Sequence, residues 1–284
     1  MGPLGRVLVT GARGALGQSL LAVLDGDDVV GLGHDGLDVA DRDAALQAVG
    51  QVAPDVVIHA GAWTDVDGCE LDPDRALRVN ALGTRNIVEG ARLAGARVLY
   101  VSTDYVFDGR ASRPYVEWDA TGPVSAYGKS KLGGESELGP EDTVVRTSWL
   151  CGSAGRNFVK TIFQRATSDQ PLRVVDDQQG CPTFTDDLAG MLRRLALERR
   201  PGVFHITNQG TTTWFRLARE VVALAGLDPE RVQPSTTAEL DPPRPAPRPM
   251  FSVLDNAALR LGGVPLLDDY HVPLERLVKE LLAV

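Results

Sequence analysis

Cysteine is scarce in this 284-residue chain, and long apolar runs are absent from it. Cys69, Cys151 and Cys181 lie far apart with no Cys-x-x-Cys spacing, which argues against a disulfide framework and for a reduced, cytoplasmic setting. No apolar run approaches the roughly 18–20 residues of a membrane span. Residues 6–10 resemble a short buried strand rather than a signal peptide. We therefore expect no membrane partner.

Blocks of like charge are also missing. The chain carries 29 basic and 38 acidic residues, a net charge of −9, and spreads them along its length. A surface of this kind argues against nucleic acid as a partner. Any phosphate-bearing ligand would have to be bound by a few placed donors. The sequence shows no internal repeat.

Short β-rich runs alternate with helical patterns from the start of the chain. Strands are expected at 7–9, 29–30, 56–58, 98–101 and 144–145, and helices at 15–24, at 41–52 and from Asp72-Pro73 towards Leu93. Continuous apolar strands between helices are typical of a parallel sheet covered on both faces. We predict an α/β fold with a Rossmann-type doubly wound parallel sheet.

The alternation is less regular after about residue 150. Helices are expected at 157–166, 186–197, 214–225 and 274–282, and strands at 172–175 and 203–206. We therefore predict an NAD(P)-binding domain over residues 1–150, to which later segments return. Residues 151–284 would form mainly a smaller C-terminal substrate-binding region. Residues 241–249 hold five prolines in nine positions, typical either of a polyproline connector or of an ordered arm over a ligand.

A glycine-rich turn, residues 10–17, follows the first strand and precedes the first helix. Gly11, Gly14 and Gly17 have the spacing that permits a tight turn, close approach of a pyrophosphate to backbone N–H groups, and close helix–strand packing. The helix N-terminus adds about half a positive charge facing the phosphates. The turn predicts a dinucleotide site, although three glycines can also be purely structural.

The choice of cofactor depends on two features. Arg13, inside the turn, either meets a 2′-phosphate or the pyrophosphate, or is simply solvated. A carboxylate ending the second strand would favour NAD. Residues 29–35 show no clean acidic terminus unless Asp35 occupies that place. NADPH is therefore slightly favoured over NADH.

Tyr127 and Lys131 lie four residues apart, so on a helix they share one face. Carbonyl reduction by hydride needs a proton for the developing oxyanion, and tyrosine can donate one. A lysine ammonium at about 4 Å contributes about 4 kcal/mol at an effective dielectric of about 20. We expect Lys131 to lower the pKa of Tyr127 by roughly three units. The alternative is a partly buried tyrosine beside a solvated lysine.

Residues 102–109 directly follow a predicted strand. In a doubly wound fold the carboxyl ends of the strands line the ligand crevice. A hydroxyl there, Ser102 or Thr103, would donate to a substrate carbonyl. Turn chemistry also explains these residue types, but their location favours a functional role.

Residues 10–17, 102–109 and 127–131 together resemble the dTDP-4-dehydrorhamnose reductases, which belong to the extended short-chain dehydrogenase/reductase superfamily. More of the chain agrees, at residues 38–39, 61–67, 146–149, 157–161, 177–183 and 248–255. The resemblance spans nearly the whole length and is specific as a set, although no single motif is. It favours an ordered proline-rich arm near the substrate.

The resemblance implies reduction of the 4-keto group of a dTDP-6-deoxy-4-ketohexose by NAD(P)H. Tyr127 would be the proton donor, Lys131 its tuner and a nicotinamide-ribose ligand, and Thr103 a partner that modulates the tyrosine. Asp104 and Trp149 would contact the sugar. The cofactor would be bound by the turn and by residues beyond it: Gly11, Arg13, Gly14, Ala15, Leu16, Gly17, Asp38, Val39, Ala62, Trp63, Thr64, Tyr127 and Lys131.

The chain also departs from the family. Trp63 replaces a smaller aromatic residue and Gly61 an alanine. Some members are dimers holding Mg²⁺; a homodimer stays open, and no metal is predicted because no acidic cluster marks a site. The related 4,6-dehydratases need Thr-Asp-Glu where this chain has Tyr105 third. A nucleotide-sugar epimerase and a non-catalytic NADP-binding regulatory subunit remain the alternatives.

Overall fold

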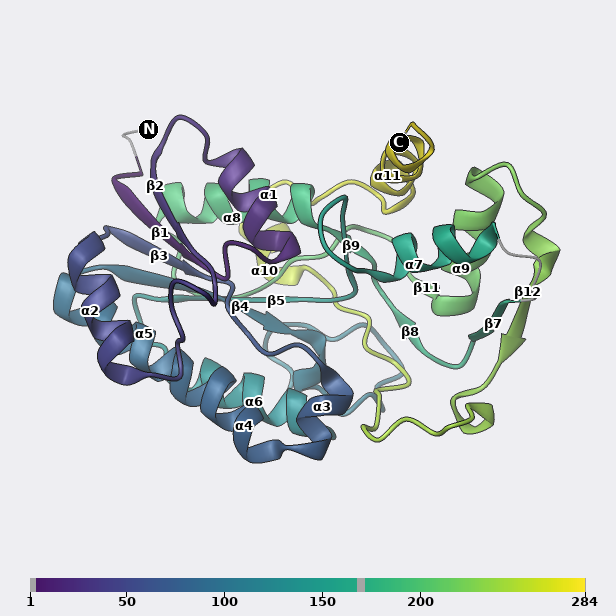
Figure 1. Ribbon diagram of the computed structural model, residues 1–284, viewed down its shortest axis with the longest axis horizontal. Coiled ribbons are helices and arrows are strands. Elements are labelled where there is room, and N and C mark those ends of the chain that lie inside the picture. The colour runs from purple at the N-terminus through teal and green to yellow at the C-terminus, as the bar shows by residue number, and fades with distance from the viewer. Residues whose placement is uncertain (1–3, 168–171, 284) are drawn as a thin grey trace.

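A six-stranded parallel sheet lies at the centre of the computed structural model, which describes residues 4–167 and 172–283 (Figure 1). The strand order is β10-β5-β4-β3-β1-β2. The strands are β1 (Arg6–Thr10), β2 (Asp28–Leu32), β3 (Val56–His59), β4 (Arg97–Thr103), β5 (Thr143–Thr147) and β10 (Gly202–His205). From β1 the chain adds β2 on one side and then β3 on the other, so the topological switch point lies between β1 and β3. The predicted doubly wound fold is confirmed.

Helices cover both faces of the sheet (Figure 1). One face carries α1 (Ala15–Val23), α8 (Thr185–Glu198) and α10 (Ala257–Leu261), and the other carries α2 (Arg42–Val52), α5 (Gly83–Ala94) and α6 (Ala126–Glu135). Val7 and Val9 pack with the first group, whereas Leu8 between them packs with the second. This alternation explains why the strands carry apolar residues on both faces.

The predicted helix from Asp72 towards Leu93 exists, but it is interrupted. Asp72 caps α4 (Pro73–Leu77), accepting a hydrogen bond from the backbone N–H of Arg75 at 3.0 Å. A π-helical turn, η1 (Arg78–Leu82), then leads into α5. A short helix that the sequence patterns did not predict, α3 (Val66–Leu71), precedes α4.

The chain after residue 150 builds a second hydrophobic cluster beside the sheet. Its helices are α7 (Phe158–Ala166), α9 (Trp214–Leu224) and α11 (His271–Leu282). Its short strands are β6 (Leu150–Cys151), β7 (Leu172–Val175), β8 (Gln179–Gly180), β9 (Thr183–Phe184), β11 (Thr212–Thr213) and β12 (Val232–Ser235). From this region α8 and β10 return to the sheet, so the division at residue 150 stays an interpretation. Within the described ranges, no helix is long and apolar enough to cross a membrane.

The proline-rich segment is an ordered arm. The backbone N–H of Ala246 donates to Asp67 Oδ1 at 3.1 Å, and the Arg248 guanidinium donates to both oxygens of the same carboxylate. On the other side Pro249 packs so closely that a Cβ on Gly109 would lie 2.6 Å from its Cα. The arm therefore connects α3 with the turn that follows β4.

Candidate active site

The glycine-rich turn lies at the carboxyl ends of β1 and β3. Gly11 has φ +67°, and a Cβ there would lie 2.8 Å from Gly61 Cα. A Cβ on Gly17 would lie 2.2 Å from the Gly11 carbonyl oxygen. Both positions therefore need glycine. Gly61, which replaces the family's alanine, borders Gly11 at this point.

The turn fits the pyrophosphate of a dinucleotide. Helix α1 begins after Gly14, which has no side chain that could cap it, so the first N–H groups of the helix, from Ala15, Leu16 and Gly17, have no capping side chain. The positive end of the helix dipole and these donors are what an anionic diphosphate requires. The turn is tight enough for close backbone approach.

Arg13 forms an ion pair just outside the turn. Its Nη1 lies 2.7 Å from Asp35 Oδ2, and both side chains are largely exposed, at 76% and 53%. Asp35 therefore lies three residues beyond the end of β2 and opposite the turn. The sequence left this carboxylate unplaced; the structure places it beside Arg13, the residue of the turn that was expected either to meet a phosphate or to be solvated.

The other predicted cofactor residues follow the ends of β2 and β3. Asp38 is exposed and accepts a hydrogen bond from the backbone N–H of Ala40 at 3.0 Å, while Val39 is buried. Ala62 and Trp63 are half-buried and Thr64 is exposed.

The backbone of Trp63 is fixed by Asn80 of the π-helical turn. The side chain of Asn80 accepts from the Trp63 N–H at 2.8 Å and donates to its carbonyl at 3.1 Å. Arg75 lies 4.3 Å from the indole centroid, and a Cβ on Gly68 would lie 2.9 Å from the indole. The larger aromatic residue is accommodated by these two neighbours.

Helix α6 presents Tyr127 and Lys131 on one buried face, at 8% and 2% exposure. Ser125 caps the helix by accepting from the Gly128 N–H at 3.1 Å. Lys131 Nζ donates to the carbonyl oxygen of Val101 at 2.8 Å and lies 4.1 Å from the ring centroid of Tyr100. Because Lys131 is buried, the alternative of a partly buried tyrosine beside a solvated lysine is excluded.

The pKa of Tyr127 differs from the expectation. Burial raises it above its ordinary value, the charge of Asp104 raises it further, and a hydrogen bond with the Thr103 side chain opposes both. Burial dominates over the depression expected from Lys131, whose ammonium donates to the carbonyl oxygen of Val101. Burial also lowers the pKa of Lys131 to about 7.

The end of β4 supplies Thr103 and Asp104. Thr103 Oγ1 donates to Asp104 Oδ1 at 3.0 Å and accepts from the Tyr105 N–H at 3.2 Å. Asp104 is 2% exposed, and its Oδ2 makes no hydrogen bond of normal geometry, although the Ser252 side chain is close enough to lower the pKa of this carboxyl. Burial raises the pKa of Asp104 to about 6. A buried oxygen without a normal hydrogen bond at a strand end fits a ligand hydroxyl.

Trp149 lies farther along the same edge, after β5. Its backbone has φ +47°, and its indole stacks on that of Trp214 with centroids 3.5 Å apart and planes 8° from parallel. A Cβ on Gly180 would lie 2.5 Å from Trp149 Cε2. Trp149 therefore packs against the C-terminal region, and it follows Thr147, the register partner of Thr103.

Sequence reasoning missed two features of the site. Ser102, left open as a polarising hydroxyl, donates to Glu135 Oε1 at 2.6 Å. Glu135 also forms an ion pair with Arg146 at 2.7 Å, in which both side chains are 7% exposed. The sequence spacing could have indicated Glu135, because it follows Lys131 by four residues on the same helix.

A cavity of about 440 Å³ opens at the opposite edge of the sheet, near the amino ends of β1 and β2. Arg6 and Asp55 line it, and Asp55 accepts from the Arg6 N–H at 2.7 Å. None of the predicted site residues lines this cavity. The predicted site residues lie instead at the edge of the sheet formed by the carboxyl ends of its strands.

Comparison with known proteins identifies the family to which a chain with this fold and site belongs. The fold, the glycine turn and the buried Tyr127–Lys131 pair place the chain among the extended short-chain dehydrogenases/reductases. Residues 5–283 match the family model described as the RmlD substrate binding domain. The chain thus belongs to the dTDP-4-dehydrorhamnose reductase family.

Individual relatives match over almost their whole length. A dTDP-4-dehydrorhamnose reductase of Streptomyces griseus is 42% identical, covering 96% of this chain and 92% of the relative. A probable dTDP-4,6-dihydroxy-2-methyloxan-3-one 4-ketoreductase of Streptomyces antibioticus is also 42% identical, covering 98% and 96%. A solved dTDP-4-dehydrorhamnose reductase of Bacillus anthracis in complex with NADP is 35% identical, with a TM-score of 0.93, covering 97% and 99%.

Proposed function

We propose that this protein is an NADPH-dependent oxidoreductase that reduces the 4-keto group of a dTDP-6-deoxy-4-ketohexose. The observation that carries the proposal is the buried pair of Tyr127 and Lys131 beside Thr103, at the sheet edge that also carries the glycine turn. The relatives named above support the substrate class, and the Bacillus anthracis structure supports NADPH as cofactor. Its place is deoxysugar biosynthesis, and its three unpaired cysteines fit a cytoplasmic setting.

The residues of the chain would divide the work as follows. The turn at Gly11–Gly17 and the N-terminus of α1 bind the pyrophosphate, and Asp38 and residues 62–64 bind the nucleoside parts. NADPH bound by these residues would supply the hydride for the carbonyl carbon. Tyr127 donates its phenolic proton to the carbonyl oxygen, which becomes the hydroxyl of the product. Its raised pKa keeps this proton in place until the oxygen gains charge.

Two neighbours support that step. The ammonium of Lys131 stabilises the tyrosinate that remains, and Thr103 holds the phenol through its hydroxyl. Asp104 Oδ2 and the indole of Trp149 contact the sugar. Tyr105 lies edge-on to Tyr127, with centroids 5.6 Å apart, where a dehydratase would need a second carboxylate. The tyrosine at this position argues against dehydration as the chemistry of the site.

A panel assay tests the proposal. The purified protein is incubated with NADPH or NADH and several nucleotide 4-keto-6-deoxysugars, while the absorbance of the reduced nicotinamide is followed. We expect oxidation of NADPH with dTDP-linked substrates and a 4-hydroxy product, whose C4 configuration NMR would define. Tight NADPH binding without oxidation on any substrate would contradict the proposal and favour a regulatory subunit.

A further inference from the structure

The catalytic helix ends at a buried charged group that the proposed mechanism does not use. Glu135 lies one turn beyond Lys131 and two turns beyond Tyr127, so all three share one face of α6. A buried carboxylate is costly unless it is paired and hydrogen-bonded. Glu135 has both kinds of partner.

Two neighbouring strands hold the Glu135 carboxylate. Arg146 Nε donates to Oε1 at 3.0 Å and Arg146 Nη2 donates to Oε2 at 2.7 Å, a two-pronged contact. Ser102 Oγ donates to Oε1 at 2.6 Å. Ser102 and Arg146 are register partners on β4 and β5. The last turn of α6 is thereby attached to the sheet edge that carries the site.

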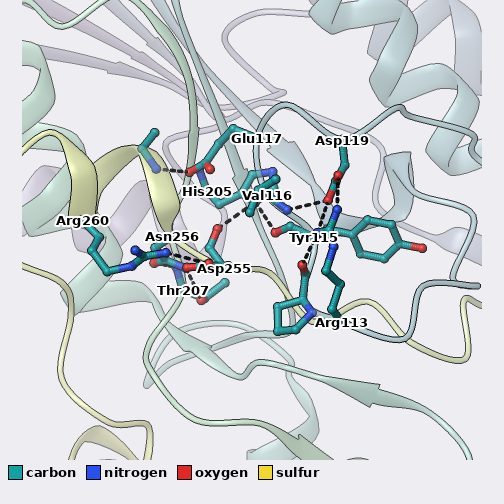
Figure 2. A network of polar contacts seen from close by, with 12 residues as sticks. Arg113, Tyr115, Val116, Glu117, Asp119, His205, Thr207, Asp255, Asn256 and Arg260 are labelled. Atoms are coloured by element: carbon teal, nitrogen blue, oxygen red, sulfur yellow. Dashed lines mark hydrogen bonds and ion pairs between the residues drawn. The ribbon is translucent and has the colours of Figure 1, made fainter.

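Arg146 is itself held from the other side. Its Nη1 donates to the carbonyl oxygen of Glu117 at 3.5 Å, and its guanidinium lies 5.3 Å from the ring centroid of Phe107. Glu117 accepts from the backbone N–H groups of His205 and Ala258, at 2.9 and 3.0 Å, within the network drawn in Figure 2. These contacts leave the guanidinium little freedom to turn away from Glu135.

The effect of the Glu135 carboxylate on Lys131 depends on the other titratable groups around that lysine. The titratable groups that face the ammonium are His59 on β3, Tyr100 on β4, and Tyr127 and Glu135 on α6. Burial lowers the pKa of His59 to about 3 and raises the pKa of both tyrosines, so these three are neutral at physiological pH. Glu135 is the group whose charge opposes the effect of burial on the pKa of Lys131.

We propose that Glu135, clamped by Arg146 and Ser102, is a positioning residue that keeps the buried Lys131 protonated. Its carboxylate acts on the ammonium from one helical turn away, and the contacts with Arg146 and Ser102 fix it in that place. The assignment itself concerns the chain without ligands. Only its consequence for turnover rests on the proposed function.

Titration of the lysine side chain tests this directly. The chain has only Lys129, Lys131, Lys160 and Lys279, so protein labelled with carbon-13 at lysine Cε gives a simple NMR spectrum. Lys131→Arg assigns the Lys131 signal. We expect Glu135→Gln to lower the titration midpoint of Lys131 by about one pH unit or more, as an opposite charge at this spacing typically does.

A control and a second variant keep the test decisive. Ser102→Ala removes one hydrogen bond to Glu135 but leaves its charge, so the Lys131 midpoint should move much less. Glu135→Gln leaves Arg146 buried without its partner, which destabilises the fold. The double variant Glu135→Gln, Arg146→Met removes both charges and should show a midpoint below that of the wild type, by less than Glu135→Gln does, because loss of the Arg146 charge favours the protonated lysine. An unchanged midpoint in either folded variant would make Glu135 purely structural.

Turnover supplies a separate readout. With an active substrate from the panel assay, the alkaline limb of the kcat profile should move to lower pH in Glu135→Gln, because Lys131 loses its proton earlier. A uniform loss of kcat with an unshifted limb would contradict the proposal. If the wild-type protein reduced none of the substrates, the proposed function would fail, while the lysine titration would still judge Glu135.

Discussion

Tyr127 illustrates how burial and charge compete at a single residue. From the sequence, a lysine four residues away should lower the pKa of the phenol. In the folded chain burial outweighs that effect, because Tyr127 is 8% exposed and the Lys131 ammonium donates to Val101 instead. A phenol that stays protonated through neutral pH is suited to giving up a proton only when a nearby oxygen gains charge.

We expect Tyr127→Phe to reduce kcat by about 10²–10⁴-fold, the usual contribution of a general acid. The aromatic ring stays in place, so the unfolding midpoint and the dissociation constant for NADPH should remain near those of the wild type. Stopped-flow turnover and fluorescence titration measure the two effects. A variant that retained more than half of the wild-type kcat would remove Tyr127 from the mechanism.

The Arg13–Asp35 pair makes cofactor preference a testable property of two exposed residues. We expect Arg13→Ala to weaken NADPH binding more than NADH binding, by about 1.5–3 kcal/mol, the range of a charge-assisted hydrogen bond. Asp35→Asn is the matched control: it frees Arg13 and removes a negative charge near the 2′-phosphate, so it should favour NADPH. Calorimetry with each cofactor decides. Equal small losses for both cofactors in Arg13→Ala would show that Arg13 is solvated or contacts the pyrophosphate, and would contradict its role in NADPH preference.

Among the elements, the glycine turn with α1 is the most constrained. A Cβ on Gly17 would lie 2.2 Å from the Gly11 carbonyl oxygen and 2.6 Å from Ala12 Cα, both backbone atoms that cannot move aside cheaply. We expect Gly17→Ala to cost about 1–3 kcal/mol of unfolding free energy and to weaken NADPH binding. Urea unfolding and calorimetry measure the two losses.

Gly50 offers a matched control in another helix. It lies in α2, and a Cβ at this position would have no neighbouring atom within 4 Å, so an alanine there meets open space. Gly50→Ala should stabilise the protein by about 0.5–1 kcal/mol. If both substitutions had the same effect, the tight turn would not be the reason for glycine at position 17.

At the scale of elements, local signals were predictable and tertiary ones were not. The helices expected from Asp41 and from Asp72 both begin there, each capped by that aspartate, because a cap depends on neighbours along the chain. The π-helical turn depends on a remote contact: Asn80 bonds to Trp63 and, at 2.9 Å, to Ser130 of α6. Such interruptions often lie at functional sites, and no local pattern marks this one.

At the scale of the whole molecule, the sequence motifs located the site but did not reveal the long-range contacts that hold it in place. Glycine spacing and the Tyr127–Lys131 pair identify the carboxyl edge of the sheet because that chemistry needs fixed residue types. The clamp on Glu135 joins α6 to two strands, and the arm joins Arg248 to Asp67 across 181 residues. Contacts between segments so far apart follow from packing, which a single sequence does not display.

The two halves of the molecule should bind different ligands, and Trp149 lies where they meet. Its indole offers an apolar face and an N–H donor to a sugar, yet it also stacks on Trp214 of α9. We expect Trp149→Ala to raise the KM for the sugar nucleotide substantially, with the dissociation constant for NADPH almost unchanged.

Trp149→Phe, which keeps an aromatic ring against Trp214, should recover stability more fully than KM. Trp118→Ala is the matched control, because that indole is 68% exposed and should affect neither constant. Separate titrations of NADPH and of the sugar nucleotide measure the two effects in Trp149→Ala. If NADPH binding weakened as much as sugar-nucleotide binding, Trp149 would be a core residue. The two halves would then not bind different ligands.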